Sequence, residues 1–577
     1  MEELINYLQS RGIDYTIKEG VLFIGEESCN LCGESDSGHI IDSKDFTLID
    51  YKPEADLQIY QFGGIWYYSR SIEAEMNLLE YLGKHPQQFM KTHLGVHGAM
   101  DILSGSRMYE DWVKKANWLG LESLGICEHN TLAGAMKFQL ACKGKIKSII
   151  GMSITVKNNG EQFRLKLFVK DSIGWLNLLR INKVINIDNE GHIDYTQLKD
   201  LLDGLQVIID TKFTRIRHLK DINTENWYYS LEPVEFVSTK ADNDFFLGLN
   251  EFIKSDMQPV ASLCSHYLER DHAFVSEIFN NMANKTTTRF PTKQWFMGEE
   301  EYINELQPFF NDIVEADSYA LRAINNANEI SNACDFNIPE MSPDNRHLPH
   351  YKMKPEEIKK YGDINTMMEA LIEDGLKKKV DKSLWKEYRE RIALELEVLD
   401  IGKVRSYFLI LWDIINWARS QGIIVGIGRG SAAGSLVAYL MDITRVNPIE
   451  YNLLFERFLN PGRVEKSLPD IDVDFSGKRR NEVKQYIIDR YGKDYFCDVG
   501  TYTNMKAKSL FKELGKLEYG YEHYVLNEMT KYWPGDVEEV KDLLKYSCGD
   551  PRLKQFIKSN SELIGDMHLM IMQPKAE

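Results

Sequence analysis

The sequence predicts a mixed α/β protein of several domains, and three observations support this prediction. The chain has 577 residues, enough for several domains of about 100–200 residues each. From residue 92 onward, strand-like and helix-like segments alternate along the chain. Further on, an apolar strand-like run leads into a glycine-rich loop at residues 426–430. Such βα alternation is typical of a layered or barrel-like domain with its site at the carboxyl ends of the strands.

The composition is that of an ordinary soluble protein, with 43% apolar and 27% charged residues. The net charge of −18 argues against a general nucleic-acid coat protein, but it permits a local basic groove. The start, "MEELINYLQS", lacks the basic residues of a signal peptide, and no apolar run is long enough to span a membrane. These features predict a cytoplasmic protein without a membrane partner.

The eight cysteines are mostly scattered, which predicts reduced thiols. Cys29 and Cys32 in "SCNLCGE" have the spacing of half a zinc knuckle, with His39 as the one nearby substitute ligand. No second CxxC follows, so a turn with two thiols is the favoured interpretation.

Segment by segment, residues 1–90 form an α+β module of unknown role, and the βα alternation fills residues 91–285. Within it the sequence predicts helices over 109–121 and 133–144 and strands over 122–127 and 146–156. Residues 286–400 read as mainly helical, interrupted by a proline-rich loop at 338–355. Helices are predicted beyond it at 407–422, 431–440, 478–492 and 503–517.

The stretch "LPDIDVDF" places Asp470, Asp472 and Asp474 at every second position with apolar residues between them. In a strand, the three carboxylates project on one side and the apolar residues fill the core beneath. Like charges this close need a cation, and hard oxygen ligands suit Mg²⁺. An EF-hand loop is excluded because its sixth and twelfth positions hold Phe475 and Asn481. A solvated acidic edge stays the alternative.

About forty residues upstream, "IIVGIGRGSAAGSL" leads from a strand through three glycines into a helix. The loop backbone and a helix N-terminus can receive an anion, while Arg429 and Ser431 add donors for phosphate. The spacing fits neither the Walker loop nor the dinucleotide fingerprint, so a plain structural turn is equally compatible. With Arg457 and Arg463 between loop and aspartates, the combination indicates phosphoryl or nucleotidyl transfer.

Long stretches resemble one known family. "VGIGRGSAAGSLVAYLMDITRVNPIEYNLLFERFLNP", "PDIDVDF" and "KRRNEVKQYIIDRYG" are similar to the palm of bacterial C-family replicative DNA polymerases, the family of the DNA polymerase III alpha subunit. "RIALELEVLDIGKVRSYFLILWDIINWARSQG", "GWLNLLRINKVIN" and "CDFNIPEMSPDNRHLPHYKM" resemble the same family. The resemblance implies a PHP-type α/β barrel-like domain at 91–285, a nucleotidyltransferase-type palm at 286–480 and a helical thumb at 481–550.

By this resemblance, the chain adds deoxynucleotides to a primer 3′-hydroxyl by two-metal nucleotidyl transfer. Asp470 and Asp472 match two catalytic ligands of Mg²⁺, and Asp474 is their neighbour. Gly430 and Ser431 match the pair that holds the triphosphate, and Arg457 matches an arginine that assists there. The segment "GRVEKSLPD" is about two residues longer than the family pattern, which puts Arg463 in doubt.

The resemblance also implies a third catalytic aspartate beyond the last residue of this chain, with residues 551–577 a truncated return to the palm. We therefore expect a split or truncated polymerase that needs a second polypeptide and polymerises poorly alone. Its expected partners are primer-template DNA, deoxynucleoside triphosphates, the second polypeptide and other replication proteins.

In the PHP-like region, the resemblance leaves His97, His129, Cys264 and His266 as a residual ligand set for one soft ion such as Zn²⁺. The family's other ligand positions hold Gly95, Ser104 and Ser153. Without bridging carboxylates, we expect a structural domain with no nuclease activity. The alternative functions are a PHP-type metal-dependent 3′-5′ exonuclease or phosphoesterase, and a non-catalytic replication protein.

Two basic stretches are candidates for the DNA backbone. Lys478, Arg479 and Arg480 follow the acidic stretch directly, and "NMKAKSLFKELGK" carries lysines at positions 506, 508, 512 and 516. The resemblance places them in the duplex-gripping thumb, whereas a solvated helix face is the plain interpretation.

Overall fold

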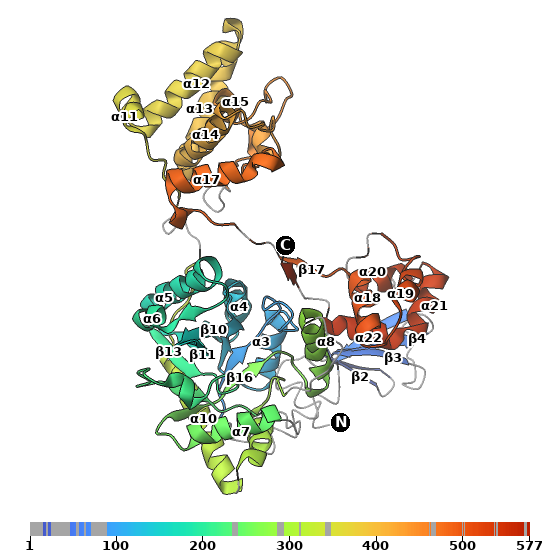
Figure 1. Cartoon of the computed structure of the whole chain (residues 1–577). Helices are drawn as coiled ribbons and strands as arrows, with labels where there is room; N and C mark the ends of the chain where they lie inside the picture. The colour runs from blue at the N-terminus through green and yellow to red at the C-terminus, as the bar shows by residue number, and fades with distance from the viewer. Residues whose placement is uncertain are drawn as a thin grey trace. The chain divides into compact units, whose positions relative to one another are not determined.

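The structure is a computed structural model, and it describes most of the chain beyond residue 88. The described residues are 15–18, 21–24, 47–52, 57–62, 65–70, 89–233, 240–284, 293–310, 313–340, 348–460, 462, 469–498, 500, 502–535, 537, 540–547, 549–570 and 574–576. The predicted cysteine turn at 29–32 and Arg463 lie outside them. The chain forms two compact units, Met1–Ile338 with Gly500–Glu577 and Pro339–Val499 (Figure 1). These boundaries differ from the predicted domain boundaries at 285, 480 and 550.

The α/β part of the first unit contains two sheets. The four-stranded sheet has the order β16-β6-β7-β9, and all its strands are parallel: β6 (Thr92–Val96), β7 (Ser123–Ile126), β9 (Lys147–Ile149) and β16 (Ser262–Ser265). Every residue of β6, β7 and β16 is buried. Burial on both faces is the rule for parallel sheets whose crossover helices cover them.

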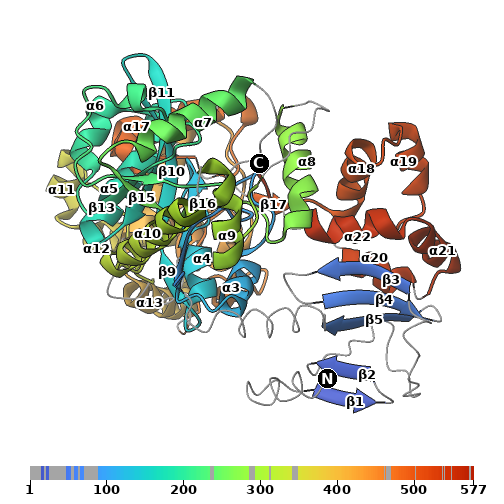
Figure 2. The same cartoon turned by 90° about the horizontal axis from the view of Figure 1, so that it is seen from below.

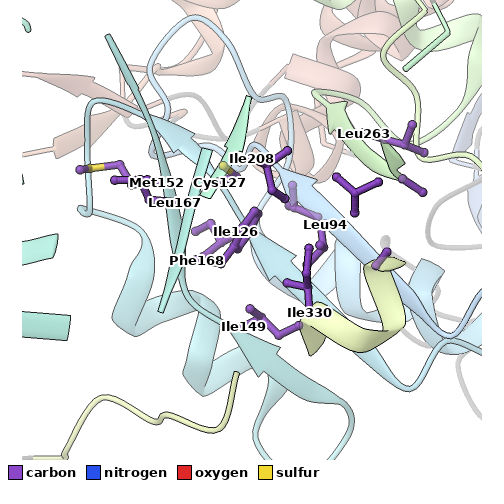
Figure 3. Close-up of a cluster of buried hydrophobic side chains, with 14 of the residues drawn as sticks. Leu94, Ile126, Cys127, Ile149, Met152, Leu167, Phe168, Ile208, Leu263 and Ile330 are labelled. Atoms are coloured by element: carbon purple, nitrogen blue, oxygen red, sulfur yellow. The ribbon is translucent and has the colours of Figure 1, made fainter. Parts of the chain in front are cut away.

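The second sheet has the order β12-β10-β11-β13-β14-β15, with β8 also paired to β10. Only the pairings of β11 are antiparallel. Its strands are β8 (Glu128–His129), β10 (Gly151–Asn158), β11 (Glu161–Val169), β12 (Ile193–Asp194), β13 (Leu205–Ile209), β14 (Tyr228–Ser230) and β15 (Gln258–Val260). Side chains from both sheets, such as Leu94, Ile126, Phe168 and Ile208, form one buried core (Figure 3).

Helices connect and cover these strands: α3 (Tyr109–Trp118), α4 (Ala135–Cys142), α5 (Ser172–Lys183), α6 (Tyr195–Leu198), α7 (Lys240–Ile253), α9 (Glu299–Leu306) and α10 (Ile313–Ala333). α5 is capped by Asp171, the residue before its first turn, whose side chain accepts hydrogen bonds from the N–H groups of Ile173 and Gly174. The predicted βα alternation is confirmed here, as is the mixed α/β fold class.

The first unit also contains the C-terminal helices and small antiparallel sheets. α8 (Ala273–Asn284) shares an apolar core with α18 (Ala507–Leu517), α19 (His523–Met529), α20 (Val540–Ser547), α21 (Pro551–Ser559) and α22 (Ser561–Met570). The strands are β1 (Tyr15–Lys18) with β2 (Val21–Ile24); β3 (Thr47–Lys52), β4 (Leu57–Phe62) and β5 (Ile65–Arg70); and β17 (Tyr502–Asn504) with β18 (Pro574–Ala576). α22 lies against β3 (Figure 2).

The second unit is helical in its described residues: α11 (Pro355–Tyr361), α12 (Ile364–Lys379), α13 (Trp385–Gly402), α14 (Arg405–Ser420), α15 (Leu436–Leu440) and α17 (Arg480–Tyr491). The predicted helices near 407–422 and 478–492 are thus present. The predicted single helix over 431–440 is wrong, because a 3₁₀ turn, Ser431–Gly434, and the extended Ser435 come before α15. Among the described helices of the chain, none is both long and apolar enough to cross a bilayer.

Candidate functional site

The acidic stretch and the glycine-rich loop lie side by side in the second unit. Val425 and Phe475 form an isolated antiparallel bridge, and the Gly426 N–H donates to the Asp474 carbonyl at 2.9 Å. About fifty residues separate the paired positions along the chain. The two motifs identified in the sequence are therefore neighbours within the same unit.

The acidic stretch alternates as predicted but is not a regular strand. Asp470, Asp472 and Asp474 are exposed, whereas the residues between them are half-buried against the core of the unit. Beyond the single bridge, no ladder forms with the described residues of the loop. The loop turns away after Gly426, with left-handed backbone at Gly428 (φ 139°) and Gly430 (φ 66°), so the expected strand has no partner to continue along.

Gly430 lies against Asp472, and Arg429 reaches both neighbouring carboxylates. A Cβ added at Gly430 would lie 2.8 Å from Asp472 Oδ2. Arg429 Nε is 3.8 Å from that oxygen, and Arg429 Nη1 is 3.5 Å from Asp474 Oδ1. These ion pairs are exposed and long, so they contribute little stability. They place one positively charged side chain beside this face of the acidic stretch.

The carboxylates have the right donor chemistry for Mg²⁺ but are too few to enclose it. Magnesium prefers near-octahedral oxygen coordination, often through one or two carboxylates with waters and substrate phosphates. Asp470 and Asp472 offer such oxygens on an exposed face. Among the described residues, no three acidic, histidine or cysteine side chains converge into a group that could hold a metal ion. The fit is therefore that of a partial site.

Tyr407 forms a hydrogen bond with the backbone of the acidic stretch, and no pattern in the sequence indicated this contact. Its hydroxyl oxygen accepts a hydrogen bond from the Ile471 N–H at 3.1 Å. Burial raises the pKa of Tyr407, and the charges of Asp470 and Asp472 raise it further. Tyr407 lies on α14, where it reads as one more aromatic residue of an apolar helix.

The start of α15 cannot receive a phosphate in the predicted way. The Leu436 and Val437 N–H groups donate to the buried carboxylate of Glu395 at 2.9 and 3.1 Å. The Ala438 N–H donates to the Ser435 hydroxyl oxygen at 3.1 Å. Since the protein itself occupies these donors, the N–H groups at the start of α15 are not open to an anion.

Arg457 is exposed at the end of a 3₁₀ turn, Phe455–Arg457. This turn follows Leu454, whose carbonyl oxygen would lie 2.7 Å from a Cβ added at Gly434. The segment that carries Arg457 thus packs directly against the end of the loop that carries Ser431. Three of the predicted phosphate ligands, Arg429, Ser431 and Arg457, belong to these two adjoining segments.

The basic residues after the acidic stretch have different surroundings. Arg479 pairs with Glu482 at 2.7 Å and donates to the Gln421 carbonyl at 2.9 Å, so it holds the start of α17. Lys478 and Arg480 are exposed. Lys506 and Lys508 belong to the other unit, at the start of α18, where they alternate with the buried Met505 and Ala507.

The four predicted ligands of the PHP-like domain are engaged with neighbouring side chains. His97 Nδ1 lies 2.6 Å from Asp101, and the His97 ring stacks on His266 with centroids 4.1 Å apart. His266 Nδ1 contacts the Ser104 hydroxyl at 2.9 Å, while His129 contacts the hydroxyls of Ser153 and Thr155, each at 3.2 Å. Two imidazoles stacked face to face do not converge on one ion.

A buried ion pair lies beside these residues. Lys166 is fully buried, pairs with Glu232 and donates to the Ser262 carbonyl at 2.6 Å. It is the cross-strand partner of Ser153, the position that the resemblance assigns to a metal-binding glutamate. Cys264 Sγ lies 3.8 Å from Glu232, and burial raises the pKa of this thiol to about 12. The predicted set of His97, His129, Cys264 and His266 does not form a metal-binding group here.

Known families match both regions. Residues 93–251 match the PHP domain, and residues 366–571 match the family described as bacterial DNA polymerase III alpha NTPase domain. The chain is 30% identical over 519 residues to the DNA polymerase III subunit alpha of Campylobacter jejuni, covering 81% of this chain and 42% of that protein. It is 29% identical over 506 residues to that of Borreliella burgdorferi, with 81% and 42% covered.

The chain therefore spans about two fifths (42%) of the length of the curated relatives it matches. The DNA polymerase III subunit alpha of Aquifex aeolicus is covered to a similar extent, with 30% identity over 77% of this chain and 41% of that protein. The matches run across both compact units of the structure. The chain thus contains a PHP domain and the bacterial DNA polymerase III alpha NTPase domain, and about four fifths of it is similar to DNA polymerase III alpha subunits.

Proposed function

We propose that this chain takes part in DNA-directed DNA synthesis, contributing the triphosphate-binding loop and part of the metal site of a nucleotidyltransferase. The observation that supports it is the position of Gly430 against Asp472. A triphosphate bound by the loop would have to lie within a few ångströms of the carboxylates, because a divalent cation held by those carboxylates would also neutralise charge on the phosphates. The loop and the acidic stretch meet this requirement.

We assign phosphate binding to the loop residues and metal binding to the aspartates. Arg429, Ser431 and Arg457 donate hydrogen bonds to the triphosphate, and Gly430 lets its backbone approach closely. Asp470 and Asp472 are the ligands for Mg²⁺, which when bound lowers the pKa of the primer 3′-hydroxyl and neutralises charge on the phosphates. Asp474 holds Arg429 beside the acidic stretch until a phosphate replaces it as the partner of that arginine.

A further carboxylate would add a third protein ligand to the site. The two aspartates leave most of the coordination sphere to waters and substrate, and the described residues bring no third ligand to them. We propose that a second polypeptide supplies this carboxylate together with part of the surface for primer-template DNA. Lys478 and Arg480 lie next to the acidic stretch and contact the DNA backbone, which makes binding depend strongly on salt.

The test measures nucleotide binding and primer extension separately. The full chain is titrated with deoxynucleoside triphosphate and Mg²⁺, and primer extension is assayed alone and after mixing with the remaining part of the Campylobacter jejuni relative. Asp470→Asn and Asp472→Asn should abolish extension, whereas Asp498→Asn, at an exposed pair with Lys484, should leave it unchanged. Normal extension by Asp470→Asn would overturn the proposal. DNA binding without any extension in the mixture would favour a non-catalytic replication protein.

A phosphoesterase in the PHP-like domain receives no support from the geometry. Its histidines are engaged with Asp101, Ser104 and Ser153, and Lys166 supplies a positive charge beside them. The residues present do not fit a multi-metal centre, so we assign no hydrolytic step to this domain.

A further inference from the structure

A fully buried carboxylate on α13 holds the segment that follows the glycine-rich loop. Glu395 accepts hydrogen bonds from the Ser435 hydroxyl at 2.8 Å, from Leu436 N–H at 2.9 Å and from Val437 N–H at 3.1 Å. Its side chain is 0% exposed. These three donors lie at the start of α15, directly after the 3₁₀ turn Ser431–Gly434 that ends the loop. The carboxylate therefore determines where the loop must end.

Arg391, one helical turn earlier on α13, binds Glu395 and also contacts a second segment of the chain. Its Nε donates to Glu395 at 2.8 Å, while its Nη2 is shared between the carbonyls of Gly434, at 3.1 Å, and Leu453, at 3.4 Å. Its guanidinium carbon also lies 5.7 Å from the centre of the Phe455 ring. One side chain thus joins the last residue of the loop to the segment that leads into Arg457.

Elsewhere the loop is held by backbone hydrogen bonds, from Gly426 N–H to the Asp474 carbonyl at 2.9 Å and from Arg445 N–H to the Ile427 carbonyl at 2.6 Å, rather than by packed side chains. Its glycines carry no side chains to pack, and Arg429 is 64% exposed. By contrast, a buried carboxylate costs several kcal/mol unless its hydrogen bonds are complete, so it fixes the positions of its donors strongly. Burial raises the pKa of Glu395, and the bonds from Leu436 and Arg391 act against that rise.

We propose that Arg391 and Glu395 are positioning residues of the nucleotide site, which hold Ser431 and Arg457 at the spacing that a triphosphate requires. This inference rests on the proposed function of the loop. Neither residue touches the substrate, because Glu395 is buried and both act through the backbone at Gly434, Ser435 and Leu453. An arginine is needed at 391, since lysine has no planar fork that can serve a carboxylate and two carbonyls together.

A purely structural role predicts something different. A pair that only stabilises the unit would lower the free energy of unfolding when it is broken, and it would leave the affinity of the folded protein for nucleotide unchanged. A positioning pair also changes the affinity of the folded fraction for nucleotide, because a displaced loop no longer presents its donors where the phosphates lie. A displacement of about 1 Å can lower the activity of an enzyme by up to about a hundredfold. Nucleotide affinity and local hydrogen exchange separate these two roles.

The experiment uses the full chain and three variants: Glu395→Gln, Arg391→Lys and the control Glu373→Gln. The control breaks an exposed pair with Arg389 at 2.8 Å, which joins α12 to the same helix α13. Binding of deoxynucleoside triphosphate with Mg²⁺, binding of DNA, and hydrogen-deuterium exchange are measured below the unfolding transition. We expect about tenfold weaker nucleotide binding for both site variants and unchanged DNA binding. Exchange should be faster at 426–437 and 451–457, and the control should match the wild type.

The outcomes separate this inference from the proposed function. If the wild type binds no nucleotide, the proposed function fails, and the exchange data alone decide whether the pair holds the two segments. If nucleotide affinity and exchange in folded Glu395→Gln match the wild type, the inference is overturned. Should Glu395→Gln fail to fold, Arg391→Lys keeps the charge and gives the same comparison, and wild-type behaviour there is equally decisive against the inference.

Discussion

Gly430 and Asp472, which lie forty-two positions apart in the chain, are in direct contact. The space that a side chain at 430 would occupy is taken by Oδ2 of the aspartate, which lies 2.8 Å from the point where a Cβ would stand. The same residue has a left-handed backbone, with φ of 66°. Glycine is therefore favoured here for its backbone, and a side chain at this position would also push the exposed carboxylate of Asp472 aside.

Replacing Gly430 by alanine should displace Asp472 as well as strain the loop. Gly422→Ala is the matched control, because Gly422 has a similar φ of 69° but nothing within 4 Å of an added Cβ. Both variants should lose about 1 kcal/mol of unfolding free energy from backbone strain. Only Gly430→Ala should also lose nucleotide binding and primer extension. Denaturant unfolding and a nucleotide titration compare the two, and equal nucleotide affinity would show that the contact has no role in binding.

Tyr407→Phe should disturb the acidic stretch without opening a cavity. The change removes only the hydroxyl that accepts the Ile471 N–H, so the loss of stability should stay near 1 kcal/mol. Because Ile471 lies between Asp470 and Asp472, primer extension in the mixture with the relative's remaining part should fall further than stability does. Trp417→Phe, at the stacked pair with Tyr486, is a control on the same helix. A variant with normal extension would restrict Tyr407 to a packing role.

Local patterns in the sequence were sufficient to predict part of this site. The alternation of Asp470, Asp472 and Asp474 with apolar residues depends on the period of an extended chain alone, and the structure has that alternation. The left-handed backbone at Gly430 likewise matches a residue type that adopts positive φ readily. These two local features depend on neighbouring residues, whereas the contact between Gly430 and Asp472 joins positions far apart in the chain.

The supporting residues could not be predicted in the same way, because their partners are distant in the sequence. Glu395 bonds to residues about forty positions away, and Tyr407 to one 64 positions away. The break between Ser431 and Leu436 depends on Glu395 taking up the N–H groups of α15, so helix propensity alone predicted one continuous helix there. In the PHP-like domain, Lys166 is one of several polar residues of β11, and nothing in the sequence marks it as buried until Glu232 is brought beside it.

The reactivity of the cysteines should show whether the PHP-like domain holds a metal ion, without any measurement of catalysis. Of the five described cysteines, Cys497 is exposed and the others are buried. Burial raises the pKa of Cys264 and Cys334 to about 12, so both are protonated and slow to react at pH 8. An alkylating reagent should modify Cys497 well before Cys264, and a chelator should leave this order unchanged. Rapid modification of Cys264 after chelation would show that a metal ion protects it.

Lys166→Met should destabilise the PHP-like domain strongly, whether or not metal is present. The substitution leaves the carboxylate of Glu232 buried without its counter-ion, which costs about 3–5 kcal/mol. The double variant Lys166→Met with Glu232→Gln should be less affected, because the side chain at 232 no longer carries a charge that has lost its counter-ion. Lys91→Met, at an exposed pair with Glu122, should change stability by less than about 1 kcal/mol.

Denaturant unfolding with and without a chelator measures the stability of all three variants and of the wild type. Since the ammonium of Lys166 provides the positive charge in this interior, the chelator should shift none of the midpoints, whereas a lower midpoint for the wild type alone would mean that a metal ion shares this role.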